Sequence, residues 1–345
     1  MRNIKIGKRI ISEKSEPLIV AEIGINHFGS LKLAKKIVDH AKRSGAEAVK
    51  VQIHIPEEEM SEEAKKIRPG NSKKNIYKII SENSLSLDEE LKLKRYIEKK
   101  NLIYIATPFS YKAADWLNKQ KIKIFKIGSG ECNNIPFVEH ICSFKKPMIV
   151  STGMNSFKSI EKTVSVLKKN KIPHALLHCV NLYPVDYNLI RLNRIKLLQK
   201  KFNNSIIGYS DHSVGNNIAI AALGLGSKII EKHFVISKNK KGPDVICSMD
   251  KRELKELINS SKNIHDALSS NADFLKAEDI TRNFAFHSVV SKIDIKRNER
   301  LNKNNLTTKR PGTGDFPAFR IKELFGKYAR RRIKKNRLIK FGDIR

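Results

Sequence analysis

Two apolar runs of the sequence end close to a histidine. The run IIGYSDHS contains His212, and the run KIIEKHF contains Glu231 and His233. Because side chains alternate along a strand, we expect Glu231 and His233 on one face and Lys232 on the other. On neighbouring strands the two imidazoles could bind one divalent metal ion, with Glu231 orienting an imidazole. The alternative is that each histidine is a structural residue at a strand end.

Two lysines interrupt other apolar runs, Lys50 in AVKVQ and Lys126 in IFKIG. An isolated ammonium group is costly to bury, so each lysine requires an anion nearby or a path to solvent. The anion is either a structural carboxylate or a phosphate or carboxylate ligand. Hydroxyl groups at the ends of other runs favour the ligand, because such an anion needs hydrogen-bond donors. These residues are Thr107, Ser129, Ser151 and Ser210.

Further polar residues follow the same runs. Glu22, Glu131 and Asp244 can act as acid or base. Gln52, Asn181 and Tyr183 add hydrogen-bonding groups, so the set indicates an enzyme. Its substrate is expected to carry phosphate or carboxylate, and a metal could polarise a carbonyl group.

The elements that position these residues form a repeating pattern. Eight β-branched runs alternate with helix-like segments, for example residues 30–45, where Ser30 is a candidate N-cap and Gly45 a stop. The pattern predicts a (β/α)₈ TIM barrel, which takes about 250 residues and holds its active site at the carboxyl ends of the strands. A doubly wound sheet is less favoured because no GxGxxG turn follows the first run. The runs are 18–25, 48–54, 102–109, 124–130, 148–154, 175–180, 206–211 and 228–234.

The two ends of the chain differ from the barrel pattern. The segment IKIGKRII near the start predicts a hairpin that covers the bottom of the barrel. From about residue 285, short alternating runs broken by Asn, Gly and Pro predict a small β-rich domain. We therefore expect a barrel domain over residues 1–268, a polar linker over 269–284 and a small domain over 285–345.

The charge is strongly basic, with 68 Lys and Arg against 35 Asp and Glu and a net charge of +33. Lysine is spread over almost every segment, and only RRRIKK at 330–335 is concentrated, so we expect a solvated basic surface. A basic nucleic-acid-binding protein on a barrel scaffold is the remote alternative. The four cysteines form no CxxC pair, and no run of about 18 apolar residues occurs. We expect a cytoplasmic protein with neither a nucleic-acid nor a membrane partner.

Longer motifs carry a resemblance to a known family. AEIGINHFGS, GAEAVKVQIH, KIGSGECNN, STGMNS, GYSDHS, EKHF and GPDVICSMD occur in that order, followed by KRPGTGDFP near the C-terminus. The chain closely resembles the bacterial N-acetylneuraminate (sialic acid) synthase family over nearly its whole length. The resemblance implies a TIM barrel followed by an antifreeze-like (SAF) domain of the β-clip type.

The resemblance also implies a reaction. Members of the family condense phosphoenolpyruvate with N-acetylmannosamine and water, giving N-acetylneuraminate and phosphate. They use a divalent cation, expected here to be Mn²⁺, with Mg²⁺ or Co²⁺ as alternatives. Close relatives make legionaminic or pseudaminic acid from diacetamido-trideoxy sugars, which is the alternative acceptor class. The GECNN motif and Arg310 favour sialic acid.

By the same resemblance, His212 and His233 hold the metal, and Glu22 steers the water or proton. The carboxylate of phosphoenolpyruvate faces Lys50, Thr107 and Lys126. Its phosphate is received by Ser129, Ser151, Asn181 and Ser210. The sugar contacts Gln52, Tyr183 and Asp244, and Glu131 is counted among the substrate-binding residues. The catalytic set is then Glu22, Lys50, Lys126 and Asp244.

Arg310 lies in the small domain, outside the barrel. The resemblance implies that this domain covers the barrel mouth of a partner subunit, where Arg310 reaches the N-acetyl group of the sugar and Phe284 joins the pocket. We therefore expect a domain-swapped homodimer. The alternative is that Arg310 only holds a Pro-Gly turn.

Overall fold

The computed structural model describes residues 3–69, 74–239, 242–270 and 273–345. The chain forms two compact units, Met1–Ser269 and Ser270–Arg345. Each unit has its own hydrophobic core. In the described part of the chain, no helix combines the length and apolar character needed to cross a membrane.

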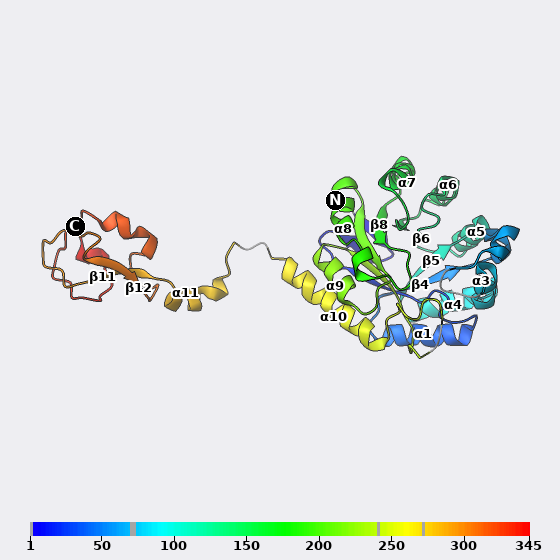
Figure 1. Ribbon diagram of the computed structural model, residues 1–345, viewed down its shortest axis with the longest axis horizontal. Helices are drawn as coiled ribbons and strands as arrows, with labels where there is room; N and C mark the ends of the chain where they lie inside the picture. Colours follow the sequence, from blue (N-terminus) through cyan, green and yellow to red (C-terminus); the bar gives the residue numbers. More distant parts are fainter. Residues whose placement is uncertain (1–2, 70–73, 240–241, 271–272) are drawn as a thin grey trace. The chain divides into compact units, whose positions relative to one another are not determined.

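The first unit is a closed barrel of parallel strands, which confirms the predicted (β/α)₈ architecture (Figure 1). The strands follow one another around the barrel, and the last closes on the first. Seven of the eight predicted runs contain one of these strands in full, and the run 175–180 contains all of β8 except its first residue, His174. They are β3 (Leu18–Glu22), β4 (Ala48–Ile53), β5 (Ile103–Pro108), β6 (Phe125–Ile127), β7 (Met148–Ser151), β8 (His174–Cys179), β9 (Ile206–Asp211) and β10 (Ile229–His233).

Helices surround these strands, and α1 packs against both α4 and α10 (Figure 1). In α1 (Leu31–Arg43), the Ser30 hydroxyl accepts a hydrogen bond from the Leu33 amide at 3.3 Å, as the N-cap prediction requires. Gly45 follows the helix with φ of 93°, a conformation that glycine adopts at low cost. The other helices are α2 (Pro56–Glu59), α3 (Ile76–Asn83), α4 (Leu87–Lys99), α5 (Tyr111–Lys119), α6 (Ile135–Ser143), α7 (Phe157–Lys169), α8 (Asn193–Lys201), α9 (Asn217–Gly224) and α10 (Lys251–Leu268).

The predicted N-terminal hairpin is present. Strands β1 (Asn3–Ile6) and β2 (Arg9–Ser12) pair antiparallel. Ile4, Ile6 and Ile11 pack with apolar residues from the amino-terminal ends of the barrel strands. Each fully buried isoleucine stabilises the fold by about 1.5–3 kcal/mol. The bottom of the barrel is therefore an apolar plug, and the polar strand ends lie at the opposite mouth.

The second unit is small and rich in short strands and bridges. It contains η3 (Lys276–Glu278), α11 (Asp279–Ala285), β11 (Ser288–Ser291), β12 (Leu306–Lys309), η4 (Ala318–Leu324) and η5 (Phe341–Asp343), and β11 pairs antiparallel with β12. The segment predicted as a linker thus includes most of a short helix, in which Arg282 bridges Asp279 at 2.6 Å. Arg282 also lies 4.3 Å from the centre of the Phe274 ring.

Candidate active site

The barrel mouth holds a cluster of four buried charged side chains from strands β3, β4, β6 and β10. Lys50 Nζ lies 2.7 Å from Glu22 Oε2 and 3.6 Å from Glu231 Oε1. Lys126 Nζ lies 3.5 Å from the same Glu231 oxygen. Glu231 therefore stands between two ammonium groups contributed by strands that are not its neighbours in the sheet.

This position corrects the expected role of Glu231. Instead of orienting an imidazole, it contacts the two lysines and accepts a hydrogen bond from Ser210 Oγ at 3.2 Å. Both lysines therefore have a carboxylate partner within the protein. Burial of the lysines therefore does not by itself require a ligand.

One carboxyl group of the cluster, that of Glu22, has a pKa close to neutral pH. Burial raises the pKa of Glu22 to about 7, against the opposing attraction of Lys50. Burial opposes ionisation of Glu231 as well, but Lys126 and Lys50 hold its pKa below the usual value. Burial lowers the pKa of Lys126, whereas the two carboxylates raise that of Lys50 in spite of its burial. Glu22 is thus the group suited to exchange a proton near pH 7.

Three of the predicted hydroxyl residues contact this cluster. Lys50 Nζ donates to Thr107 Oγ1 at 3.3 Å, and Lys126 Nζ donates to Ser151 Oγ at 2.8 Å. Ser210 contacts Glu231 as described above. The carboxyl ends of β5, β7 and β9 therefore supply hydroxyl groups around the two lysines.

Ser129 and Asn181 both lie close to Gly153. The Gly153 amide donates to Ser129 Oγ at 3.1 Å. A Cβ atom at Gly153 would lie 1.9 Å from Asn181 Oδ1 and 2.9 Å from Ser129 Oγ, so the site requires glycine there. The Cys179 sulfur lies 3.6 Å from Asn181 Oδ1. These groups form the polar wall of the mouth beyond Ser151.

The two histidines meet as predicted, with ring centres 5.6 Å apart. His212 Nδ1–H donates to the Val180 carbonyl at 2.8 Å, which leaves Nε2 as an acceptor. Burial lowers the pKa of His212 to about 4 and that of His233 to about 3, so both are neutral at pH 7. Neutral imidazoles with an available lone pair fit a divalent cation.

The described residues contain no group of three or more His, Cys, Asp or Glu residues placed to hold a metal ion. Asp244 Oδ2 is 3.7 Å from His233 Nδ1, beyond hydrogen-bond distance, and burial raises the pKa of this carboxyl group. The Tyr183 ring centre lies 4.0 Å from that of His212. A cation at the two imidazoles would therefore have coordination positions left for water or substrate.

Gly24 lies where three site residues converge. A Cβ atom at this position would lie 3.0 Å from Glu22 Oε1 and 3.4 Å from both Gln52 Nε2 and His233 Cε1. Its φ of 43° also favours glycine. The backbone of the β3 loop thus brings acid, amide and imidazole together.

On the other side of the mouth, burial raises the pKa of Glu131. A Cβ atom at Gly128 would lie 2.4 Å from Glu131 Oε2 and 3.8 Å from the Phe109 ring. Glu131 is therefore placed beside Phe109, at the end of β6.

The sequence analysis missed His54 and its neighbours. His54 Nδ1 lies 3.0 Å from both carboxylate oxygens of Glu59, and His54 Nε2 lies 3.1 Å from Gln52 Oε1. Its ring stacks on Phe109. The available signal was the alternation of Lys50, Gln52 and His54 along one strand face.

Arg310 and Phe284 belong to the second unit, and only their contacts within it are determined. Arg310 Nε donates to the Ala285 carbonyl at 3.1 Å, and its guanidinium lies 6.0 Å from the centre of the Phe284 ring. Phe284 is exposed. Arg310 also lines a basic hollow of about 630 Å³ with Arg331, Arg332, Lys334 and Arg337.

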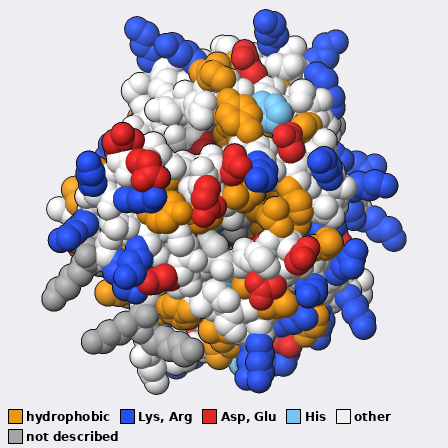
Figure 2. Space-filling view, turned by 90° about the vertical axis from the view of Figure 1, so that its right-hand side faces the viewer, with side chains coloured by type: hydrophobic (Ala, Val, Ile, Leu, Met, Phe, Trp, Pro, Cys, Tyr) orange, Lys and Arg blue, Asp and Glu red, His pale blue; other side chains and the backbone are white. Residues whose placement is uncertain are grey.

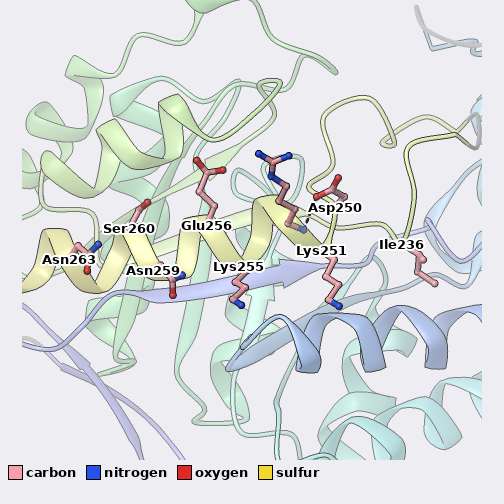
Figure 3. Close-up of a pocket in the computed structure, with 9 residues that line it drawn as sticks. Ile236, Asp250, Lys251, Lys255, Glu256, Asn259, Ser260 and Asn263 are labelled. Atoms are coloured by element: carbon pink, nitrogen blue, oxygen red, sulfur yellow. Dashed lines mark hydrogen bonds between the residues drawn. The ribbon is translucent and has the colours of Figure 1, made fainter.

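A hollow of about 720 Å³ on α10 contains none of the predicted site residues (Figure 3). Lys251 and Lys255 point to one side of the helix, and Glu256 and Ser260 point to the other. Because these side chains do not converge, the hollow is a surface groove and no candidate for catalysis.

Figure 2 shows Lys and Arg side chains scattered around the margin of one face, with acidic groups nearer its centre. The basic charge on this face is therefore dispersed.

Comparisons with known proteins agree with this fold and show the family. The NeuB family model matches residues 37–273, and the SAF domain model matches residues 287–345. The N,N'-diacetyllegionaminic acid synthase of Campylobacter jejuni is 37% identical over 331 residues, which cover 94% of this chain and 98% of that protein. The human N-acetylneuraminate-9-phosphate synthase is 32% identical, with 90% of this chain and 87% of that protein covered.

A solved structure is similar as well. The N-acetylneuraminic acid synthetase of Leptospira borgpetersenii, in complex with citrate, has 32% identity and a TM-score of 0.75, with 81% of this chain and 95% of that chain covered. The family model spans more than half of the chain, and the Campylobacter relative matches nearly all of it. The chain therefore belongs to the NeuB family of sialic-acid-type synthases and carries a C-terminal SAF domain.

Proposed function

We propose that this synthase condenses phosphoenolpyruvate with an open-chain 2-acetamido sugar aldehyde and water. The products are a nine-carbon 2-keto sugar acid and phosphate. The observation that carries the proposal is the arrangement at the barrel mouth, where Lys50 and Lys126, surrounded by hydroxyl groups, lie close to two neutral imidazoles.

The anionic substrate would occupy the lysine side of the mouth. Its carboxylate faces Lys50, Thr107 and Lys126. Its phosphate is received by Ser129, Ser151, Asn181 and Ser210. In the absence of substrate, Lys50 is paired with Glu22 at 2.7 Å. The internal carboxylates thus hold the lysines ready in the absence of substrate.

The reaction forms one carbon–carbon bond and one carbon–oxygen bond to water, and it breaks the carbon–oxygen bond to phosphate. C3 of phosphoenolpyruvate attacks the aldehyde carbon, water adds at C2, and phosphate leaves with its bridging oxygen. Glu22 steers the water and its proton. A divalent cation held by His212 and His233, expected to be Mn²⁺ with Mg²⁺ or Co²⁺ as alternatives, would polarise the aldehyde oxygen. Gln52, Glu131, Tyr183 and Asp244 bind the sugar.

Two acceptors remain candidates. The sequence motifs favour N-acetylmannosamine. The 37% identity to a relative named N,N'-diacetyllegionaminic acid synthase favours a diacetamido-trideoxy hexose, against 32% for the human N-acetylneuraminate-9-phosphate synthase. We rank the diacetamido sugar first, because that match also covers more of both chains.

The test is phosphate release from phosphoenolpyruvate with Mn²⁺ and each acceptor in turn. We expect release with at least one acetamido sugar, and its loss in Lys126→Met. Lys123→Met is the matched control, because Lys123 is exposed and lies three residues before Lys126. No release with any acetamido aldose would overturn the proposed reaction, and preference for N-acetylmannosamine would reverse our ranking.

The proposal includes a domain-swapped homodimer. Arg310 of one subunit would reach the N-acetyl group of the sugar in the partner's barrel, and Phe284 would line the same pocket. The exposed Phe284 beside Arg310 supports this arrangement, because an uncovered aromatic group next to a cation suits a sugar-binding contact.

A further inference from the structure

His54 is held on three sides at the end of β4. Its Nδ1 atom lies 3.0 Å from both oxygens of Glu59, which belongs to the short helix α2. Its ring stacks on Phe109 with ring centres 4.3 Å apart and an angle of 8° between the planes. The side chains of His54 and Glu59 are only 5% and 7% exposed. The imidazole therefore has a single orientation.

The free nitrogen of this ring contacts Gln52. His54 Nε2 lies 3.1 Å from Gln52 Oε1. The carboxylate of Glu59 holds the opposite edge of the ring at Nδ1. An amide oxygen only accepts hydrogen bonds, so in the contact with Gln52 the imidazole is the donor. The oxygen of the Gln52 amide is thus occupied, and its NH₂ group is left to point elsewhere.

The NH₂ group of Gln52 points into the mouth. Gln52 Nε2 lies 3.4 Å from the Cβ position of Gly24, around which Glu22 Oε1 and His233 Cε1 also lie. Without His54 the amide could turn over and present its oxygen to the mouth, where the Glu22 carboxyl already supplies acceptors. Fixing a glutamine side chain also costs conformational entropy, and the contact with His54 offsets this cost before a ligand binds.

We propose that His54, held by Glu59 and Phe109, is a positioning residue that makes Gln52 a fixed hydrogen-bond donor to an oxygen of the acceptor sugar. The inference rests on the proposed function, in which Gln52 binds the sugar. Part of the recognition of the acceptor then depends on His54, Glu59 and Phe109, which need not touch the substrate. A fixed donor matches the hydroxyl and acetamido oxygens that the acceptor class carries.

The role predicts an effect on one substrate only. The hydrogen bonds and ion pairs that the structure shows for His54 include none with Lys50 or Lys126, so the phosphoenolpyruvate side should be unaffected. His54→Leu removes the donor to Gln52. It should raise the KM for the acceptor about tenfold, the equivalent of about 1.4 kcal/mol, and leave the KM for phosphoenolpyruvate within about twofold. A purely structural role would change kcat and both KM values together.

Two conservative variants keep the test valid where His54→Leu unfolds. His54→Gln can still donate to Gln52 and should recover part of the acceptor KM. Glu59→Gln keeps a polar group in contact with Nδ1, so its effect should be smaller than that of His54→Leu. The matched control is His140→Leu, because His140 also pairs with a carboxylate, Asp115, at 2.8 Å, but does so between helices α5 and α6.

The measurement is phosphate release by the full chain with Mn²⁺, varying each substrate at saturating levels of the other. A selective rise in the acceptor KM for His54→Leu, partly rescued by His54→Gln and absent in His140→Leu, supports the inference. An unchanged acceptor KM, or an equal rise in both KM values, would overturn the positioning role alone. Absence of turnover by the unmodified chain with every acetamido acceptor would overturn this role together with the proposed function.

Discussion

A buried ion pair outside the barrel lumen offers a sharp test of the structure. Lys232 alternates with Glu231 and His233 along β10 and therefore faces the helix layer. Its ammonium lies 2.6 Å from Asp211 Oδ2 and donates to the Ser213 carbonyl, also at 2.6 Å. The side chains of Lys232 and Asp211 are 1% and 0% exposed. The pair ties β10 to the turn that carries His212.

Lys232→Met removes the ammonium but retains a flexible apolar chain of similar length. Asp211 would keep hydrogen bonds from the Ser213 amide, the Ser213 hydroxyl and Tyr209. Its charge would nevertheless be buried without a counter-ion, which costs about 3–5 kcal/mol. At about 2–4 °C per kcal/mol for a domain of this size, the Tm should fall by about 6–20 °C. The double variant Lys232→Met/Asp211→Asn should lose less than the sum of its single variants, because no charge is then left unpaired.

The assay is thermal unfolding followed by circular dichroism at one scan rate, with Lys65→Met as the control. Lys65 pairs with Glu62 at 2.7 Å, but their side chains are 44% and 82% exposed, so its loss should leave the Tm nearly unchanged. A Tm for Lys232→Met within about 2 °C of that of the control would refute the claim that Asp211 depends on a buried counter-ion.

Three further outcomes are expected. Because the pKa of Glu22 is raised to about 7, lowering the pH through 7 protonates it, and turnover should fall at acidic pH. Glu22→Gln should lose most of the turnover, and its remaining activity should no longer fall at acidic pH. If that fall is unchanged in Glu22→Gln, Glu22 is not its source. Chelation should abolish activity and Mn²⁺ should restore it, whereas His212→Ala should lose that response; full activity in chelator would remove the metal from the mechanism. Mixing Arg310→Ala chains with Lys126→Ala chains should restore part of the activity through hybrid dimers. Failure to complement despite proven subunit exchange would argue against a site completed by the partner subunit.

The strands and their polar ends could be predicted because both depend on local patterns. Eight apolar runs at regular spacing predicted a closed barrel, and in such a barrel polar residues that end parallel strands share one mouth. The meeting of His212 and His233 followed from their places on consecutive strands. For the same reason Thr107, Ser151 and Ser210 were expected near the two lysines, and the structure places them there.

The partners of individual charges could not be predicted. Alternation along β10 indicated the face of Glu231 but not its neighbours, and its partners Lys50 and Lys126 come from strands that are not adjacent to it in the sheet. His54 was missed because its role depends on Glu59 and Phe109, which reach it from a short helix and from the end of β5.

Local patterns were enough to predict the barrel, the small terminal domain and the types of side chain at the mouth, because periodicity and composition act over a few neighbouring residues. Closure of the barrel decided which of these groups meet. It placed one carboxylate between two lysines, raised the pKa of Glu22 to about 7, and set the His54 imidazole against the Gln52 amide. Such pairings depend on distances across the barrel, and these exist only when all eight strands are in register.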